Sequence, residues 1–214
     1  MTDGQTPSIF VLAGTNGAGK SSVAGAAFRA AGVDYFNPDE TTRRILETQP
    51  QLGLAEANSR AWLVGKGLLE RAIESRLRFA FETTLGGNTI PALLERAHDA
   101  GLPVRIWFVG LASPELHLAR VKARVAKGGH DIPEAKIRER YDRSRLNLIS
   151  LLPKLTELSI FDNSAEADPA TGVAPSPRLI LHACDGAIRE TCDLNTVPGW
   201  AKPLLVEALR QYSH

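Results

Sequence analysis

Apolar residues along the chain fall into short unbroken runs and into longer segments where they recur every three or four positions. The short runs, rich in β-branched and aromatic residues, are typical of buried strands and lie at residues 8–13, 33–36, 78–82, 103–109, 158–161 and 178–182. Helical spacing is seen at residues 20–31, 40–48, 53–78, 90–100, 113–127 and about 134–152. Strands alternating with helices predict βαβ crossovers, and therefore an α/β fold with a mainly parallel sheet.

A length of 214 residues fits a single domain, which we expect to span residues 1–214. Within it, residues 165–177 contain three prolines and several small residues, which predicts a surface loop. In the helix at 53–78, the inward-facing candidates include Leu63, Gly67, Leu69 and Ile73.

Net charge is only +1, so the chain as a whole lacks the basic character of a nucleic-acid or membrane-surface protein. Any anion site must therefore be local. The sequence contains no apolar run of about 18 residues, and its polar N-terminus lacks the basic and apolar regions of a signal peptide. We expect a cytoplasmic protein that does not associate with membranes.

The segment GTNGAGKS at residues 14–21 has the pattern G-x-x-x-x-G-K-[ST] and lies between a predicted strand and a predicted helix. Its glycines let successive backbone amides point at phosphate oxygens, and the helix N-terminus favours negative charge. Lys20 can neutralise the β and γ phosphates, and the Ser21 hydroxyl suits Mg²⁺. We therefore predict ATP and Mg²⁺ as cofactors, and a three-layer α/β/α fold of the P-loop NTPase type. The nucleotide-binding candidates are Gly14, Asn16, Gly17, Ala18, Gly19, Lys20, Ser21 and Ser22, with Ser21 as metal ligand.

Two carboxylates follow predicted strands that end at the same sheet edge as the phosphate loop. Asp39 comes just after the second strand, where it could accept the proton of an attacking hydroxyl or hold a water on Mg²⁺. The alternative is that Asp39 caps the helix beginning at Glu40. Glu82 ends the third strand and could hydrogen-bond an acceptor's hydroxyls, or serve as a turn or capping carboxylate.

Positive charge is concentrated between Arg120 and Arg145, with nine Lys or Arg and four Asp or Glu. Two amphipathic helices joined by a glycine-containing turn, over about residues 113–152, suit a helical lid that closes over a triphosphate. A solvated hairpin with ordinary surface ion pairs is the alternative, and it is the better interpretation for most individual arginines. His130 in the turn is a weak candidate for a substrate contact.

Taken in order, these motifs resemble those of the zeta-toxin-like P-loop kinases, and particularly their compact chromosomal branch. The likeness covers about residues 8–185. It rests on residues 14–22, on NPDE at 37–40, on FETTLGG at 81–87, on residues 124–134 with GGHDIPE, and on the pairs at 140–141 and 147–148. This ordered set is far more specific than the phosphate loop alone.

The resemblance implies a kinase that phosphorylates the 3′-hydroxyl of the sugar in UDP-N-acetylglucosamine. In that picture Asp39 is the catalytic base, Lys20 is the P-loop lysine and Ser21 is the metal ligand. The family's toxins are neutralised by a small antitoxin, which makes such a protein a candidate partner.

The resemblance also assigns four further residues. Glu82 and Thr84 belong to the segment that holds the nucleotide sugar, and Arg124 and Arg140 are the lid arginines that clamp the phosphates.

Two other functions stay open at this point. The acceptor could be another nucleotide, a nucleoside or a nucleic-acid end, although a nucleic acid would call for a longer basic track with aromatic stacking groups, and only Tyr141 lies in the basic segment. The protein could instead be an ATP-binding regulator whose lid responds to the nucleotide without any acceptor. We favour a small-molecule kinase.

Overall fold

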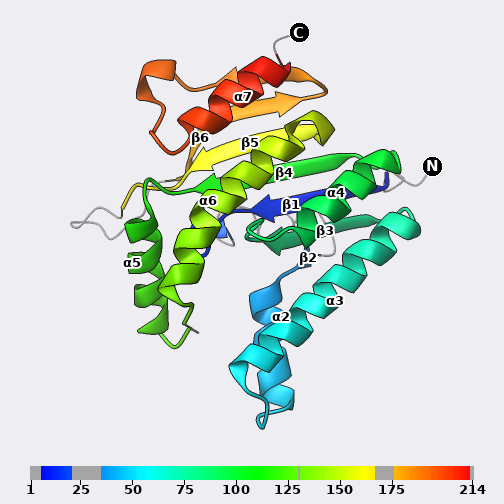
Figure 1. Cartoon of the computed structure of the whole chain (residues 1–214), viewed down its shortest axis with the longest axis vertical. Helices are drawn as coiled ribbons and strands as arrows, with labels where there is room; N and C mark the ends of the chain where they lie inside the picture. Colours follow the sequence, from blue (N-terminus) through cyan, green and yellow to red (C-terminus); the bar gives the residue numbers. More distant parts are fainter. Residues whose placement is uncertain (1–5, 21–34, 130, 167–175, 213–214) are drawn as a thin grey trace.

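The computed structural model describes residues 6–20, 35–129, 131–166 and 176–212, whose strands form a seven-stranded sheet in the order β2-β3-β1-β4-β5-β6-β7 (Figure 1). Five strands run parallel: β1 (Ser8–Ala13), β2 (Tyr35–Phe36), β3 (Arg78–Thr83), β4 (Val104–Gly110) and β5 (Glu157–Asp162). The last two, β6 (Arg178–Cys184) and β7 (Ala187–Thr191), are antiparallel to their neighbours. The prediction of a mainly parallel sheet is confirmed.

The order of the strands places β1 between β3 and β4, so its side chains are buried on both faces. Ile9 and Val11 face the large hydrophobic core, while Leu12 lies in a smaller cluster on the other side. A central parallel strand of this kind reads as a continuous apolar run, as it does here. The segment that follows β1 therefore starts from a strand that is paired on both sides and buried on both faces.

The described helices are α2 (Pro38–Thr48), α3 (Leu54–Glu74), α4 (Thr89–Asp99), α5 (Pro114–Val125), α6 (Glu134–Leu151) and α7 (Lys202–Tyr212). In Figure 1, α4, α6 and α7 cross the near face of the sheet, while α2 and α5 extend beyond its edge. The helix predicted at residues 20–31 lies almost entirely outside the described residues.

The part of α3 before Leu69 differs from the prediction. Leu69 and Ile73 are buried as expected, but Leu63 is 57% exposed and Gly67 is exposed. This part of α3 packs mainly against α2, and the side chains buried there are small ones such as Ala57 and Ala61. Helical spacing alone could not indicate how far the helix extends beyond the core.

The C-terminal segment continues the sheet and the core beyond what the sequence predicted. The hairpin between β6 and β7 turns at Asp185 and Gly186, which have φ values of 52° and 73°. This is the arrangement that Asp-Gly favours in two-residue hairpins. After the hairpin, Trp200 packs beside Phe108, with 6.2 Å between the centroids of the two tilted rings, and donates from Nε1 to Asp162 Oδ1 at 3.1 Å.

Candidate active site

The phosphate loop at residues 14–20 leaves β1 through three glycines in the left-handed region. Gly14, Gly17 and Gly19 have φ values of 141°, 82° and 81°, a conformation that side chains rarely allow. A Cβ on Gly14 would lie 2.2 Å from the Val109 carbonyl oxygen, so the loop also needs glycine to pass β4. The predicted residues Ser21 and Ser22 lie outside the described residues.

Lys20 lies with its ammonium group inside the loop. Its Nζ donates to the carbonyl oxygens of Gly14, at 2.8 Å, and Thr15, at 3.4 Å, and the residue is only 6% exposed. Glu82 Oε1 is 3.4 Å from the same Nζ. A buried ammonium that is held by carbonyl oxygens and one carboxylate can turn toward an incoming phosphate without leaving its place in the loop.

Asp39 is the second residue of α2, and it does not cap that helix. The N-cap is Asn37, whose Oδ1 accepts from the backbone N–H groups of Asp39, at 2.8 Å, and Glu40, at 3.3 Å. The sequence analysis left a capping role open for Asp39, and the structure gives that role to Asn37. The Asp39 carboxylate instead accepts from Arg124 Nη1, with Oδ2 at 3.3 Å.

Glu82 lies near the end of β3, in a largely buried position between Lys20 and two residues close to β2. Its Oε2 accepts from Tyr35 Oη at 2.7 Å and from Asn37 Nδ2 at 3.4 Å. The contacts with Lys20, Tyr35 and Asn37 fix the orientation of this carboxylate. They join different segments of the chain, unlike the local contacts of a turn or capping carboxylate.

A cavity of about 860 Å³, called here the phosphate cavity, brings these groups together. It is lined by residues of the phosphate loop, the ends of β2 and β3, one side of α3 and both lid helices. The predicted site residues among its lining are Asn16, Gly17, Gly19, Lys20, Asp39, Glu82, Thr84, Arg124 and Arg140. Gly14 and Ala18 shape the loop but do not line the cavity.

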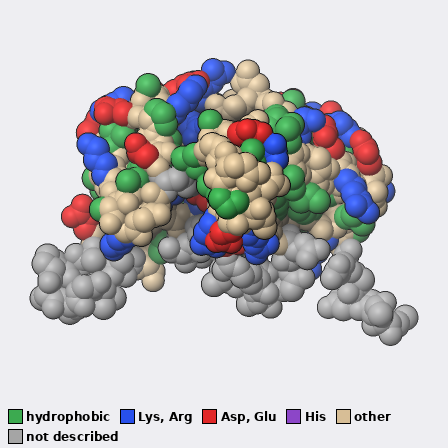
Figure 2. Space-filling model, turned by 90° about the horizontal axis from the view of Figure 1, so that it is seen from below, with side chains coloured by type: hydrophobic (Ala, Val, Ile, Leu, Met, Phe, Trp, Pro, Cys, Tyr) green, Lys and Arg blue, Asp and Glu red, His purple; other side chains and the backbone are tan. Residues whose placement is uncertain are grey.

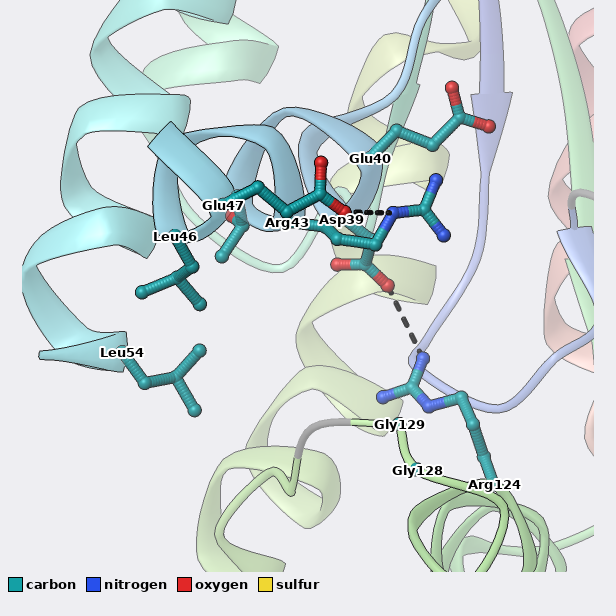
Figure 3. A pocket seen from close by; sticks show the side chains of 10 residues that line it. Asp39, Glu40, Arg43, Leu46, Glu47, Leu54, Arg124, Gly128 and Gly129 are labelled. Atoms are coloured by element: carbon teal, nitrogen blue, oxygen red, sulfur yellow. Dashed lines mark hydrogen bonds and ion pairs between the residues drawn. The ribbon is translucent and has the colours of Figure 1, made fainter. Parts of the chain in front are cut away.

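A second pocket of about 490 Å³ adjoins the phosphate cavity at Asp39 and Arg124, which line both. Figure 3 shows it between α2, the first residue of α3 and the glycines after α5. The Asp39 and Arg124 side chains point toward one another across it (Figure 3). Their ion pair therefore stands at the boundary between the two spaces.

The lid hairpin, residues 113–152, contacts the phosphate loop through side chains of α6. Arg140 Nη1 donates to Asn16 Oδ1 at 2.8 Å, and Thr15 Oγ1 lies 3.2 Å from Ser144 Oγ. Burial lowers the pKa of Arg140, although Glu139 and Asp39 act in the opposite direction. His130, the candidate for a substrate contact in the turn of the hairpin, lies outside the described residues.

Most other lid cations form surface ion pairs, as the sequence analysis expected for individual arginines. These pairs are Lys136–Glu139, Arg138–Glu115, Arg138–Glu134, Arg143–Glu139 and Arg145–Asp142. On the face drawn in Figure 2, Lys and Arg side chains are interspersed with Asp and Glu side chains. Four lid cations line the phosphate cavity: Arg124 and Arg140, and also Arg120 and Lys136, which sequence reasoning had not singled out.

Sequence reasoning missed two residues that contact the phosphate loop from outside. His117 on α5 has its Nδ1 2.8 Å from the Asn16 carbonyl oxygen, and Asn163 after β5 donates from Nδ2 to the Ala18 carbonyl oxygen at 2.8 Å. Both had a signal. His117 precedes Val121 by one turn on the apolar side of α5, and Asn163 follows a strand that ends at the edge of the phosphate loop.

Asn147 on α6 was also given no role of its own. Its Nδ2 donates to the carbonyl oxygens of Leu85, at 2.7 Å, and Gly87, at 2.9 Å. It thereby fixes the loop after β3 that carries Thr84.

None of the described helices combines the length and the apolar character that a membrane crossing requires.

The chain is similar in sequence to a known protein family and to a bacterial protein. The sequence model of the family described as Zeta toxin matches residues 1–167. An uncharacterised protein of Haemophilus influenzae is 35% identical over 138 residues, which are 64% of this chain and 94% of that protein.

Solved structures with the same fold are far more distant in sequence. A chain of the AvrRxo1-ORF1:-ORF2 complex with ATP has a TM-score of 0.67 at 16% identity over 97% of this chain, which spans only 65% of that chain. A chain of the PezAT chromosomal toxin-antitoxin system of Streptococcus pneumoniae has a TM-score of 0.54 at 14% identity, over 74% of this chain and 69% of that one. The predicted three-layer α/β/α fold of the P-loop type is confirmed. The family match covers most of the sequence, and the chain therefore belongs to the zeta toxin family.

Proposed function

We propose that this protein is an ATP- and Mg²⁺-dependent kinase that transfers the γ-phosphoryl group to a hydroxyl of a small molecule. The observation that carries the proposal is the phosphate cavity, which brings the P-loop lysine, two lid arginines and a strand-end carboxylate into one space. Such a set supplies both the charge neutralisation and the proton acceptor that phosphoryl transfer needs.

In the proposed reaction, the acceptor's hydroxyl oxygen attacks the γ-phosphorus while the bond to the β–γ bridging oxygen breaks and ADP leaves. Asp39 takes the hydroxyl proton. Lys20 turns from the Gly14 and Thr15 carbonyl oxygens toward the phosphates, and Arg124 and Arg140 offset charge on the transferred group. All four residues line the phosphate cavity, which supports these roles.

The donor chemistry of the site fits Mg²⁺. This ion takes most of its ligands from phosphate oxygens and water, and few from the protein. The Ser21 hydroxyl is the proposed direct ligand, while Asp39 and Glu82 offer carboxylate oxygens in the cavity that could hold coordinated waters. When bound, the ion would neutralise charge on the β and γ phosphates.

The leading acceptor is UDP-N-acetylglucosamine, with phosphorylation at the 3′-hydroxyl of the sugar. The resemblance in the segments around Asp39 and Glu82 suggests it, and the cavity, at about 860 Å³, has a size typical of small-molecule sites. Glu82 and Thr84 would hold the nucleotide sugar. Glu82 is already bound by Lys20, Tyr35 and Asn37, so it would receive a hydroxyl on its exposed side.

A small antitoxin is proposed as a partner, and the cytoplasm as the place of action. The PezAT structure, whose fold this chain shares, comes from a toxin-antitoxin system, and this supports the first part. The zeta toxin family membership supports it as well.

The proposal is tested by a phosphate-transfer screen with labelled ATP against nucleotide sugars, nucleosides and short oligonucleotides, read by mass spectrometry. We expect a product 80 Da heavier than UDP-N-acetylglucosamine, which is the mass of one added phosphoryl group as about HPO₃. Lys20→Ala, assayed in parallel, should weaken ATP binding itself. ATP binding without transfer to any acceptor would favour the regulator, and unchanged ATP affinity in Lys20→Ala would refute the phosphate site.

A further inference from the structure

Four carbonyl oxygens of the phosphate loop, those of Gly14, Thr15, Asn16 and Ala18, are each held by a hydrogen-bond donor. The Gly14 oxygen accepts from Lys20, the Thr15 oxygen from the Ala18 backbone N–H at 3.1 Å. Two more carbonyl oxygens are held from outside the loop, Asn16 by His117 and Ala18 by Asn163. Because a carbonyl oxygen carries partial negative charge, an oxygen facing the cavity would repel a phosphate.

We propose that His117 and Asn163 are positioning residues that aim the backbone N–H groups of Gly17 and Gly19 into the phosphate cavity. The inference rests on the ATP binding proposed above, and it assigns a role to two residues outside the loop motif. Neither residue lines the cavity itself. Each would act through the loop backbone, and neither would touch the phosphate.

The geometry of the peptide bond connects each carbonyl to the next amide. In a trans peptide the C=O and the N–H of one plane point in opposite directions. Fixing the Asn16 oxygen on His117 therefore turns the Gly17 N–H the other way, and fixing the Ala18 oxygen on Asn163 does the same for Gly19. Gly17 and Gly19 both line the phosphate cavity. Their N–H groups, which point away from the two anchored carbonyl oxygens, are therefore directed toward the space that the phosphate would occupy.

The two contacts leave no space behind the loop. A Cβ on Gly17 would be 2.8 Å from the His117 carbonyl oxygen, and a Cβ on Gly19 would be 2.5 Å from Asn163 Nδ2. The loop backbone therefore lies directly against α5 on one side and the end of β5 on the other. A peptide flip that exposed a carbonyl to the cavity would break one of the two hydrogen bonds.

The chemistry of His117 suits a permanent donor. A carbonyl oxygen can only accept, so Nδ1 must carry the ring proton. The residue is 1% exposed, and burial lowers its pKa to about 4, so the ring stays neutral and in this tautomer at physiological pH. The Tyr141 ring meets it edge-on, with 5.6 Å between centroids, and fixes its plane.

The test uses variants that differ in the donor alone. His117→Asn keeps an amide N–H near the Nδ1 position, whereas His117→Leu removes it; Asn163→Asp replaces the donor with an acceptor of the same shape. We expect His117→Leu and Asn163→Asp to weaken binding of both ATP and inorganic tripolyphosphate about tenfold, the effect of one lost hydrogen bond to the loop. His117→Asn should stay within a few-fold of the wild-type protein, and Asn195→Asp, at an exposed position, should change nothing.

The measurement is calorimetric titration, with circular dichroism to establish that each variant is folded. Folded His117→Leu and Asn163→Asp proteins with wild-type affinity would overturn the inference while leaving the kinase proposal intact. A wild-type protein that binds neither ATP nor tripolyphosphate would instead overturn the proposed function, and this inference with it.

A second measurement needs no variant. In ¹⁵N spectra of the wild-type protein, His117 should show a protonated Nδ1 and an unprotonated Nε2, and the Gly17 and Gly19 amide resonances should shift when tripolyphosphate is added. A proton on Nε2, or tripolyphosphate binding that leaves both glycine amides unmoved, would contradict the proposal even if the variants failed to fold.

Discussion

Arg124 Nη1 lies 3.3 Å from Asp39 Oδ2, so a lid arginine and the carboxylate proposed as base form an ion pair between α5 and α2. The two side chains are 35% and 45% exposed, and a pair this accessible to water contributes little to stability. Its effect is on position, because it holds Arg124 where the phosphate cavity meets the second pocket. A phosphate that entered would compete with Asp39 for the same guanidinium.

Replacing Asp39 with asparagine should separate catalysis from binding. Asparagine retains the shape of the side chain but accepts no proton, so phosphoryl transfer should fall by about a hundredfold or more while ATP affinity is nearly kept. Steady-state kinetics and titration with ATP measure the two quantities. Glu40→Gln, one residue further along α2, is the matched control, and an equal loss in that variant would contradict the assignment.

Replacing Arg124 with alanine tests the lid. If this guanidinium stabilises charge on the transferred group, kcat should drop by about tenfold at least, with a smaller change in ATP affinity. Arg124→Lys should restore only part of the activity, because lysine lacks the planar fork. Lys122→Ala, at an exposed position of the same helix, is expected to be neutral. A kcat for Arg124→Ala equal to that of the wild-type protein would remove Arg124 from the reaction.

The buried His117 predicts how stability depends on pH. Its pKa is lowered to about 4 in the folded protein, against an ordinary value of 6.5, so the unfolded chain binds a proton that the folded one does not. Stability should therefore be fully present above pH 6.5 and should fall as pH drops toward 4, by roughly 1.4 kcal/mol per pH unit at most from this residue.

Urea unfolding at a series of pH values measures this effect as a difference from a variant. His117→Asn should lose that part of the slope, whereas the exposed control His98→Asn should keep it. Parallel pH profiles for the wild-type protein and His117→Asn would show that the histidine is not buried in its neutral form.

Trp200 should be a major contributor to the stability of the fold. It is 4% exposed and lies so close to Gly110 that a Cβ there would be 2.3 Å from its ring. Trp200→Ala should lower the free energy of unfolding by about 3–5 kcal/mol, as large-to-small core substitutions do. Trp62→Ala removes an equal side chain that is 44% exposed and should cost much less. Similar losses in the two variants, measured by denaturant unfolding, would contradict this.

The sequence predicted those features that have a local signal. The apolar run of β1 and the glycine-rich segment after it identify a strand and a loop by composition alone, and the positions of Lys20 and Asp39 follow from the rule that parallel strands end at one edge. Ser113 caps α5 as its residue type suggests, with Oγ accepting from the Leu116 N–H at 3.3 Å.

The remaining features depend on contacts between distant segments. The choice between Asn37 and Asp39 as helix cap is decided by where the backbone turns, which residue types alone do not indicate, because both can cap. The contact of His117 with Asn16 joins residues 101 positions apart, and that of Asn163 with Ala18 joins residues 145 apart. Helical spacing could have placed His117 near the apolar face of its helix, but only the folded chain shows which carbonyl oxygen it contacts.

The family match ends at residue 167, while the sheet goes on through β6 and β7, and Tyr212 of α7 donates to the Leu152 carbonyl oxygen at 2.8 Å. A protein shortened to the matched region would leave one edge of β5 unpaired and would uncover leucines that now pack beneath α7. The residues after the match thus support α6, the helix that carries Arg140. Expression of residues 1–167 by themselves would be expected to yield aggregates.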